Sequence, residues 1–498
     1  MKRIFSIGLI LSLMMYVSSC GDEFLDVNVD PNNPADAPAE NVFPVAVIST
    51  AGVVGGNYAI LGGLWSQYYT QSNTANQYKT TDAFNLQQSD YQNSWSELYS
   101  GALNDYKFTK QKASASGNWD TNFMATVMES YTYQILVDLY DQIPFEEALQ
   151  GNTGNVSPTY RGGQDVYDSL IVRIDKAMAM PISTSSAQVT PATKANDLLF
   201  GGDMNQWLRF ANTLKLKIYL RQVYARPQVA EAGIKSLYAS GAQFLQTDAN
   251  VDIFSDETSR SNPLYEQDQR QLNSTQNLKA SLTLFSYLQA NNDPRLDVYY
   301  IPTTTGSAQR AMQQGEFETP TSQLSGATVS RARISPTAPV YFISEAESYF
   351  LQAEAVLRGF GTGDVAALYN AGIDASFAQT ATTRPAEAYA FPTGGSFEQK
   401  LEAIIVQKWV ALAGTTQGIE AYFERNRTGF PRTSTVRALN QDRTANANYV
   451  AGQFVYPIEG VTNNIFAKRL LFPQTETTRN PNTPTVVPIT TPIWWDVD

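Results

Sequence analysis

Residues 201–221 read GGDMNQWLRFANTLKLKIYLR, and the order of apolar and polar residues in this stretch points to the fold class. Its apolar residues recur at steps of three and four positions, which places them on one face of an α-helix. They are Trp207, Phe210, Ala211, Leu214, Ile218 and Tyr219. The spacing predicts a long amphipathic helix over Met204–Ala225 that packs its apolar face against the rest of the protein.

The same periodicity begins at about Phe43 and predicts further helices on both sides of this one. Three of them cover Ser89–Ala113, Asn118–Asp141 and Gln164–Met180. A tryptophan at helical spacing is more often a packing residue than a ligand contact. We therefore expect the tryptophans on the apolar faces to be core residues. They are Trp95, Trp207 and Trp409.

The C-terminal third contains clear helix starts. The segments 344–347 (SEAE) and 396–399 (SFEQ) both fit a capping box, in which the serine and the residue three positions on bond each other's backbone amides. Helices over Ser344–Arg358 and Asp364–Gln379 form a pair of about 34 residues, the period of a tetratricopeptide repeat. A second pair is predicted over Ser396–Ala413 and Gln417–Arg427.

Two long segments, Gln243–Thr275 and Tyr299–Tyr341, are polar and lack helical periodicity. Long segments of this kind are usually functional loops or small insertions. We expect them to form a loop-rich lobe at about residues 243–341.

Composition excludes several classes of protein. The chain has 35 Lys and Arg against 47 Asp and Glu, a net charge of −12, which disfavours nucleic-acid binding. Hydrophobic residues make up 43%, enough for a large core and too many for a disordered chain. Charged residues make up only 16%, below the roughly 25% of an average domain, while aromatic residues reach 12%.

The chain has no histidine and one cysteine. These counts exclude Ser–His–Asp and Cys–His catalytic centres, His-ligated metal sites and internal disulfides. Neither a phosphate-binding G-x-x-x-x-G-K-[ST] loop nor a G-x-S-x-G elbow is present. An enzyme built on this chain would have to use carboxylates, Lys, Tyr or a Ser–Lys pair.

The single cysteine is explained by the N-terminus. Lys2 and Arg3 precede the apolar stretch Ile4–Val17, which is shorter than the ~20 residues of a membrane span. Residues 17–20 (VSSC) resemble a bacterial lipobox, so we expect residues 1–19 to be a signal peptide and Cys20 to be lipidated, with palmitate among the acyl groups. Residues 20–42 are rich in Asp, Asn and Pro and predict a flexible tether. No later apolar run is expected to reach spanning length.

Several segments, in this order behind the lipobox, resemble the SusD/RagB-like nutrient-binding lipoproteins of the Gram-negative outer membrane. The clearest is 201–221, similar to the family's G-G-D-x-x-x-W-x-x-F-A-N-T-L-K-L-x-x-x-x-R helix. Three positions in the matching segments depart from the family's pattern. Asp141-Gln142 stands where the family has Gly–Asp, Tyr422 stands where it has Trp, and Asn426 stands where it often has Arg. The other matching segments are 136–149 (LVDLYDQIPFEEAL), 407–431 (QKW to RTGFP), 456–463 and 494–496 (WWD).

The resemblance implies a mostly α fold of tetratricopeptide-like helical pairs with an irregular, loop-rich lobe, in one domain over residues 43–498. It implies a lipid-anchored, surface-exposed protein of the outer membrane that is not an enzyme. Such proteins capture an oligosaccharide, or in some members a peptide, and deliver it to a SusC-like TonB-dependent transporter. We expect no cofactor.

Ligand contacts are expected in the polar, poorly periodic stretches, where aromatic rings can stack on sugars and amides can bond hydroxyl groups. Two clusters fit, and we hypothesise that their loops meet over the binding face. The first contains Tyr69, Gln71, Asn73, Asn76, Gln77 and Tyr78. The second contains Tyr265, Gln267 and Arg270.

The sequence leaves three alternatives to consider. A glycosidase needs two carboxylates about 5–10 Å apart, and Asp138 and Asp141 with 146–147 (EE) are the candidates, although a structural role at the helix end is favoured. The segments 248–252 and 26–30 begin like EF-hand loops but lack the later Gly and Glu, which leaves only a loosely bound Ca²⁺ open. A helical-repeat scaffold that binds only protein is the third.

Overall fold

The computed structural model describes residues 37–273, 277–304, 306–386 and 388–497. The signal peptide, the lipidation site expected at Cys20, most of the tether and the segment 26–30 lie outside these residues. The described chain is mostly helical, which confirms the predicted fold class.

The helix at the centre of the sequence argument is α10, Met204–Arg221. Asp203 caps its start, because its carboxylate accepts hydrogen bonds from the backbone N–H groups of Asn205 and Gln206. The helix ends four residues before the expected Ala225, since the chain turns there to begin α11 (Pro227–Ala239) with a proline at its first position.

The other predicted helices form close to their expected limits. Ser89–Ala113 is divided into α5 (Gln92–Ser96), the π-helix η3 (Glu97–Leu103) and α6 (Asn104–Ser116). The remaining predicted helices are α7 (Trp119–Tyr140), α8 (Gly163–Met178), α15 (Glu345–Leu357), α16 (Val365–Gln379), α17 (Phe397–Leu412) and α18 (Gly418–Thr428). Shorter helices are α4 (Lys79–Asp82), α9 (Pro191–Asn196), α13 (Leu282–Ala290), α14 (Leu296–Tyr299) and α19 (Gln474–Arg479).

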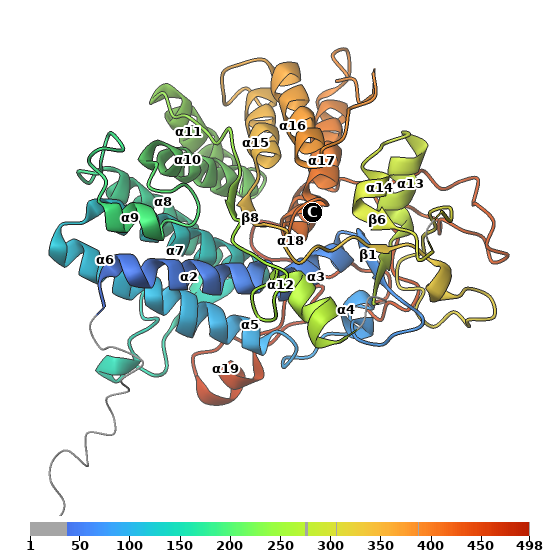
Figure 1. Ribbon diagram of the computed structural model, residues 1–498, viewed down its shortest axis with the longest axis horizontal. Helices are drawn as coiled ribbons and strands as arrows, with labels where there is room; N and C mark the ends of the chain where they lie inside the picture. The colour runs from blue at the N-terminus through green and yellow to red at the C-terminus, as the bar shows by residue number, and fades with distance from the viewer. Residues whose placement is uncertain (1–36, 274–276, 305, 387, 498) are drawn as a thin grey trace, which may run out of the picture.

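Neighbouring helices in the chain pack as pairs that stand side by side (Figure 1). The pairs α6–α7, α10–α11, α15–α16 and α17–α18 follow one another across the molecule. Trp95, Trp207 and Trp409 are each at most 3% exposed, which confirms them as core residues. One large apolar cluster spans the protein, and two smaller ones lie between α15, α16 and α17 and between α10, α11 and α15.

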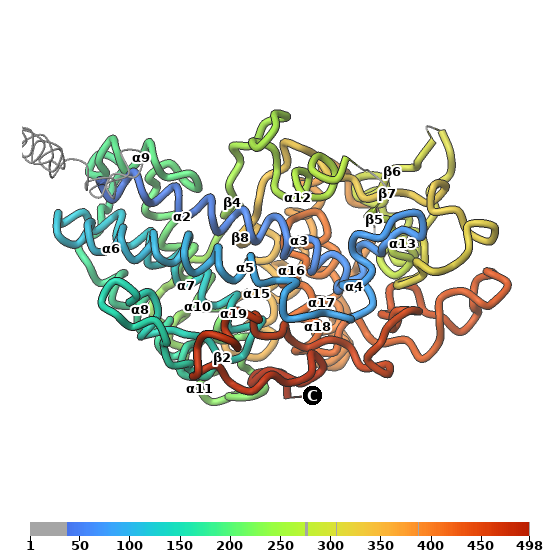
Figure 2. Tube along the Cα trace, turned by 90° about the horizontal axis from the view of Figure 1, so that it is seen from below, coloured from blue at the N-terminus to red at the C-terminus, as the bar shows by residue number. Residues whose placement is uncertain are grey.

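Two N-terminal helices, α2 (Ala39–Val54) and α3 (Asn57–Trp65), run through the body (Figure 2). The helix α2 begins at Ala39, so the last four residues of the expected tether belong to it. We expected no apolar run after the signal peptide to be long enough to span a membrane. The stretch Ala39–Trp65 contradicts this expectation, because its length and hydropathy suit a membrane span. However, 72% of its most apolar window is buried inside the protein, as in a core helix.

The helices α3 and α18 approach so closely that only glycine fits between them. A Cβ atom placed on Gly62 would lie 1.9 Å from the backbone nitrogen of Ile419. This contact joins the N-terminal helices to the last helical pair.

The two predicted capping boxes form to different extents in the structure. At α17 both hydrogen bonds between Ser396 and Gln399 form. At α15 the Ser344 oxygen accepts from the N–H of Glu347, but the Glu347 carboxylate lies beside Lys217 in the protein interior instead of returning to Ser344. The expected box at 344–347 is therefore only half formed.

The loop-rich lobe is organised by a small antiparallel sheet of order β1-β5-β7-β6. In it, Tyr69 pairs with Ala280 and Tyr300 pairs with Ala332. The strands of this sheet are β1 (Tyr69–Gln71), β5 (Leu278–Ala280), β6 (Tyr300–Ile301) and β7 (Arg331–Ala332). Two further ladders pair β2 (Gln142–Pro144) with β3 (Tyr160–Gly162) and β4 (Ala249–Val251) with β8 (Val340–Ile343).

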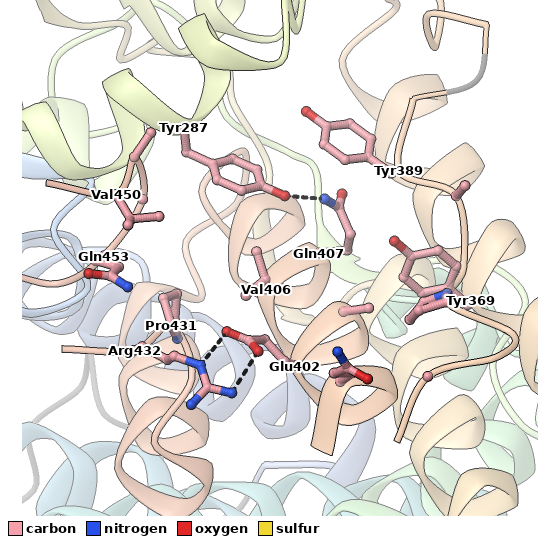
Figure 3. Close-up of a pocket in the computed structure, with 17 residues that line it drawn as sticks. Tyr287, Tyr369, Tyr389, Glu402, Val406, Gln407, Pro431, Arg432, Val450 and Gln453 are labelled. Carbon is pink, nitrogen blue, oxygen red and sulfur yellow. Dashed lines mark hydrogen bonds and ion pairs between the residues drawn. The ribbon is translucent and has the colours of Figure 1, made fainter. Parts of the chain in front are cut away.

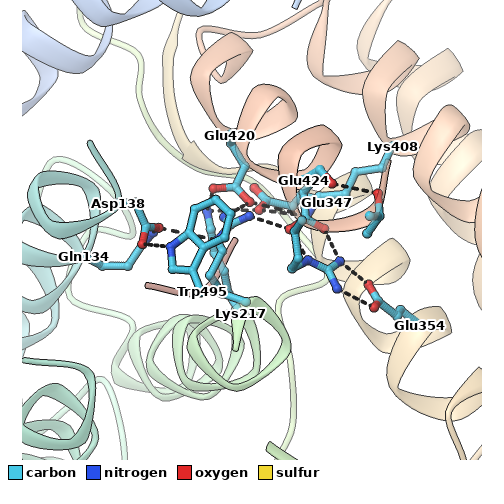
Figure 4. A network of polar contacts seen from close by, with 12 residues as sticks. Gln134, Asp138, Lys217, Glu347, Glu354, Lys408, Glu420, Glu424 and Trp495 are labelled. Atoms are coloured by element: carbon cyan, nitrogen blue, oxygen red, sulfur yellow. Dashed lines mark hydrogen bonds and ion pairs between the residues drawn. The ribbon is translucent and has the colours of Figure 1, made fainter. Parts of the chain in front are cut away.

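A buried network of charges joins the helical pairs (Figure 4). Arg221 of α10 lies 2.6 Å from Glu420 and 2.5 Å from Glu424, both on α18. Lys408 of α17 faces the same glutamates, and Arg427 bridges Glu424 to Glu354 of α15 at 2.7 Å each. The segments that carry the family resemblance in α10, α17 and α18 thus supply much of this network.

Candidate functional site

The two predicted loop clusters come together in the structure. The second cluster lies on the short helix α12 (Pro263–Tyr265) and the π-helix η5 (Glu266–Gln271). The hydroxyl group of Tyr78, from the first cluster, hydrogen-bonds the carboxyl group of Asp268 on η5. Asn277, at the start of β5, donates a second hydrogen bond to Asp268 at 3.2 Å.

Most residues of the first cluster are buried or bonded to neighbouring loops, and so hold the contact between the two clusters in place. Tyr69, Gln71 and Tyr78 are buried, and the Gln71 amide oxygen accepts from the N–H of Tyr78 at 2.6 Å. The Asn73 amide donates to the carbonyl groups of Thr319 and Leu324 and so fixes the 319–326 loop. The two remaining members face solvent. They are Asn76 and Gln77.

The second cluster is held in place by ionic contacts. Arg270 lies over the ring of Tyr265, with 5.3 Å between the guanidinium carbon and the ring centroid. Its guanidinium group contacts Asp256 at 2.6 Å and Glu266 at 3.1 Å. These contacts tie the 253–261 loop to η5.

A cavity of about 730 Å³ opens between this loop, η5 and α2, and we call it the lobe cavity. Gln267 lines it, and its amide oxygen is buried and has no hydrogen-bond partner among the described residues. Apolar contacts are offered by Ile48 of α2 and by Ile253, which is 53% exposed. The rest of the lining is Gly52, Phe254, Ser255, Glu257, Ser259, Arg260, Ser261, Pro263, Glu266 and Gln271.

The lobe cavity has the composition of a small-molecule site. Such sites combine apolar walls with a few placed polar groups and usually measure about 300–1,000 Å³. Of the predicted contacts, Gln267 lines the cavity directly, while Arg270 acts through Glu266 and Ser261 on its rim.

Two buried carboxyl groups beneath this region have shifted pKa values. Burial raises the pKa of Asp268 to about 6, against opposing hydrogen bonds from Asn277 and Tyr78. Burial likewise raises the pKa of Asp82 to about 6, although the N–H of Gln71 and the hydroxyl of Thr70 donate to it. In both cases the opposing donors are neutral groups, which favour the ionised form less strongly than a cation would.

A second cavity, of about 500 Å³, lies between α13, α16 and α17 and was not foreseen from the sequence. We call it the tyrosine cavity, because Tyr287, Tyr369 and Tyr389 line it. Tyr389 belongs to the irregular segment 388–396, in a stretch of sequence (380–396) that is rich in Thr, Pro and Gly. An aromatic residue in a loop without helical spacing was the signal that selected Tyr265, and it would have selected Tyr389 too.

The carboxylates of the glycosidase alternative serve structural contacts. Asp138 is fully buried and accepts hydrogen bonds from the Tyr167 hydroxyl at 2.6 Å and the Trp495 indole at 2.8 Å. Asp141 ends α7 and accepts from the backbone N–H of Trp494 at 2.8 Å. Glu147 accepts from the N–H of Thr159 at 3.0 Å in the turn that follows. These contacts agree with the favoured structural role at the helix end.

The segment 248–252 also contributes a structural contact, since Asp248 accepts a hydrogen bond from the N–H of Glu345 at the start of α15. Within the ranges that the structure describes, no group of three or more acidic or cysteine side chains is placed to hold a metal ion. A loosely bound Ca²⁺ stays a prediction.

Comparison with known proteins gives concordant results. A family model, SusD-like_2, described as starch-binding and associating with the outer membrane, matches residues 35–457. No protein among curated sequences matches the chain significantly.

Solved structures share the fold over nearly their whole length. A SusD homologue from Bacteroides uniformis superposes with a TM-score of 0.74 at 21% identity, covering 92% of this chain and 99% of the other. A chitin-binding SusD homologue from Flavobacterium johnsoniae gives 0.72 at 20% identity, covering 92% and 99%. A SusD-like protein from Bacteroides thetaiotaomicron gives 0.70 at 21%, covering 93% and 99%. With the family match spanning most of its length, this chain belongs to the SusD-like family.

Proposed function

We propose that this protein is a non-catalytic lipoprotein of the outer-membrane surface that captures an oligosaccharide and delivers it to a SusC-like TonB-dependent transporter. Cys20 would carry the lipid anchor. The observation that supports capture best is the lobe cavity, which Gln267 lines and Arg270 supports from its rim.

The geometry favours binding over hydrolysis. Gln267 lines the lobe cavity beside the apolar side chains of Ile48 and Ile253, and its buried amide oxygen has no hydrogen-bond partner among the described residues. A sugar offers matching groups, because its ring has apolar C–H faces and hydroxyl donors around its edge. The acidic groups Asp138 and Asp141, by contrast, are engaged by tryptophan and tyrosine side chains and by backbone.

The class of ligand can be tested by calorimetric titration of the protein lacking residues 1–20. The panel contains neutral hexasaccharides of glucose, xylose, mannose and N-acetylglucosamine, and a mixed peptide digest. The N-acetylglucosamine hexamer comes first, because a chitin-binding homologue shares the fold. We expect saturable binding of one hexasaccharide with no turnover, and binding of peptides alone would change the ligand class to the alternative.

The position of the site can be tested with Ile253→Trp, which fills the mouth of the lobe cavity. We expect it to weaken saccharide binding at least about tenfold, that is by roughly 1.4 kcal/mol or more. Val461→Trp is the matched control, because Val461 is 54% exposed and lines neither cavity. Equal affinity of the two variants would reject the lobe cavity as the site.

The transporter partner can be tested with the full chain. We expect the lipidated protein to co-purify from outer membranes with a transporter-sized partner in a stable complex. Recovery of the protein alone, under conditions that keep other outer-membrane complexes intact, would contradict this part of the proposal.

A further inference from the structure

The tyrosine cavity offers a second set of ligand contacts, on elements that do not contribute to the lobe cavity. It is formed by α13, α16, α17 and the irregular segments 389–395, 431–432 and 450–453. Figure 3 shows the rings of Tyr287 and Tyr389 at one end and the Glu402–Arg432 pair at the other, with Gln407 between the two rings.

The two tyrosine rings are held rigidly. They lie nearly parallel, with 10° between their planes and 6.1 Å between their centroids. The Tyr389 hydroxyl donates to Asp293 at 2.6 Å, and Asp293 is itself fixed by the buried guanidinium group of Arg295. Gly452 lets the 450–453 segment pack on Tyr287, since a Cβ atom there would lie 2.6 Å from the ring.

A buried amide beside these rings lacks a full set of partners. Gln407 is 2% exposed, and its amide nitrogen donates to the Tyr287 hydroxyl at 2.8 Å. Its amide oxygen has no hydrogen-bond partner among the described residues. Turning the amide over would exchange the two atoms and leave the other one unpaired. An unpaired buried amide atom costs free energy, and a ligand recovers that cost if the side chain turns its amide into the cavity that Gln407 lines.

The charged groups at the other end define the class of ligand. Glu402 and Arg432 form a two-pronged ion pair, with both N–O distances at 2.8 Å. Among the described residues that line this cavity, Glu402 and Arg432 are the only charged ones, and their charges cancel, which favours a neutral ligand. A carboxylate next to a guanidinium group presents acceptors and donors side by side, which suits the neighbouring hydroxyl groups of a sugar ring.

From this combination we propose that the tyrosine cavity is a second saccharide-binding site, which takes a neutral sugar unit. The sugar lies against the tyrosine rings, bonds Gln407 with one polar group, and bonds the Glu402–Arg432 pair with adjacent hydroxyl groups. The volume of about 500 Å³ is within the usual range for a small ligand. This inference rests on the proposed function only for the chemical class of the ligand.

The experiment repeats the hexasaccharide titrations with a variant that blocks this cavity. Val450 is 58% exposed at the cavity mouth, so Val450→Trp fills the mouth without disturbing the core. Glu402→Gln is a milder second variant, which keeps the side-chain shape and removes the charge. Val461→Trp again serves as the control, and melting temperatures verify that each variant is folded.

We expect two binding events in the wild-type protein. The event at the tyrosine cavity is lost in Val450→Trp and weakened several-fold in Glu402→Gln. The event at the lobe cavity is lost in Ile253→Trp. Unchanged binding in Val450→Trp would overturn the second site and leave the proposed function standing. Loss of all binding in Val450→Trp and none in Ile253→Trp would support the tyrosine cavity and reject the lobe cavity. Failure of every hexasaccharide to bind the wild-type protein would overturn both.

Discussion

Glu424 in the helical body and Asp82 beside the loop-rich lobe both carry buried carboxyl groups, but their pKa values are shifted in opposite directions. Burial would raise the pKa of Glu424 in the body, yet the guanidinium group of Arg427, with Lys408 and Arg221, holds it well below its usual range. Burial raises the pKa of Asp82, which accepts a hydrogen bond from β1 of the lobe sheet, to about 6, because its hydrogen-bond partners are neutral.

This difference indicates how the two regions are built. The glutamates of the body network are compensated by fixed cations, which join its helical pairs. Asp82 and Asp268 rely on neutral donors instead, although other lobe carboxylates, such as Asp293 beside Arg295, are paired with cations. Gln267 at the lobe cavity and Gln407 at the tyrosine cavity also have an amide oxygen without a partner among the described residues.

The largest effect is expected from removing a cation of the body. Arg221→Met leaves Glu420 and Glu424 buried without this counter-ion, and we expect the free energy of unfolding to fall by about 3–5 kcal/mol. Urea denaturation measures this change. Arg226→Met is the control, since Arg226 pairs with the half-exposed Asp168 and such pairs contribute about 0–1 kcal/mol. A similar loss of stability in both variants would show that the buried ion pairs contribute no more than the surface pair.

A smaller change in stability is expected when the pH is lowered from 7 to 5. The folded-state pKa of Asp82 is about 6, above the ordinary value of 3.8, so its protonation on acidification favours the folded state. Between pH 7 and pH 5 the wild-type protein should gain about 1 kcal/mol of stability that Asp82→Asn does not gain. The comparison uses the slope of stability against pH, because the substitution also changes hydrogen bonds at every pH.

The body should respond to pH in the opposite sense. The folded-state pKa of Glu424 is lowered, so its contribution is present above the unfolded-state pKa and is lost as the pH falls further, below about 4. Stability should therefore pass through a maximum near pH 5. A monotonic fall in stability from pH 7 to pH 4 would show that the lobe carboxylates are not shifted upward.

The smallest change in stability is expected at the tyrosine cavity. Gln407→Met removes one hydrogen bond to Tyr287 and one unpaired amide atom, so unfolding should change by less than about 1 kcal/mol while saccharide binding weakens. Gln417→Met is the matched variant in the body, where the amide donates to the buried carboxylate of Glu347. Hydrogen bonds to charged groups contribute about 1.5–3 kcal/mol, so this variant should be the less stable of the two.

Sequence periodicity was sufficient for most of the helical body. The helix over Met204–Arg221 and the box at Ser396 were predicted because both depend on residues close together in the chain. The box at Ser344 formed only in part, since Glu347 has a stronger partner in Lys217, which is remote in the chain. The tyrosine cavity was missed for the same reason, because its lining residues come from six separated segments.

The sequence by itself determined the helical pairs, the core tryptophans and the family, because these follow from local spacing and from motifs that can be compared directly. Only the tertiary structure decided which polar residues are structural and which line a cavity. Asp138 and Gln267 are both polar residues in candidate sites, yet one is enclosed by Tyr167 and Trp495 while the other faces an open cavity. That distinction depends on partners brought from elsewhere in the chain, which no local pattern specifies.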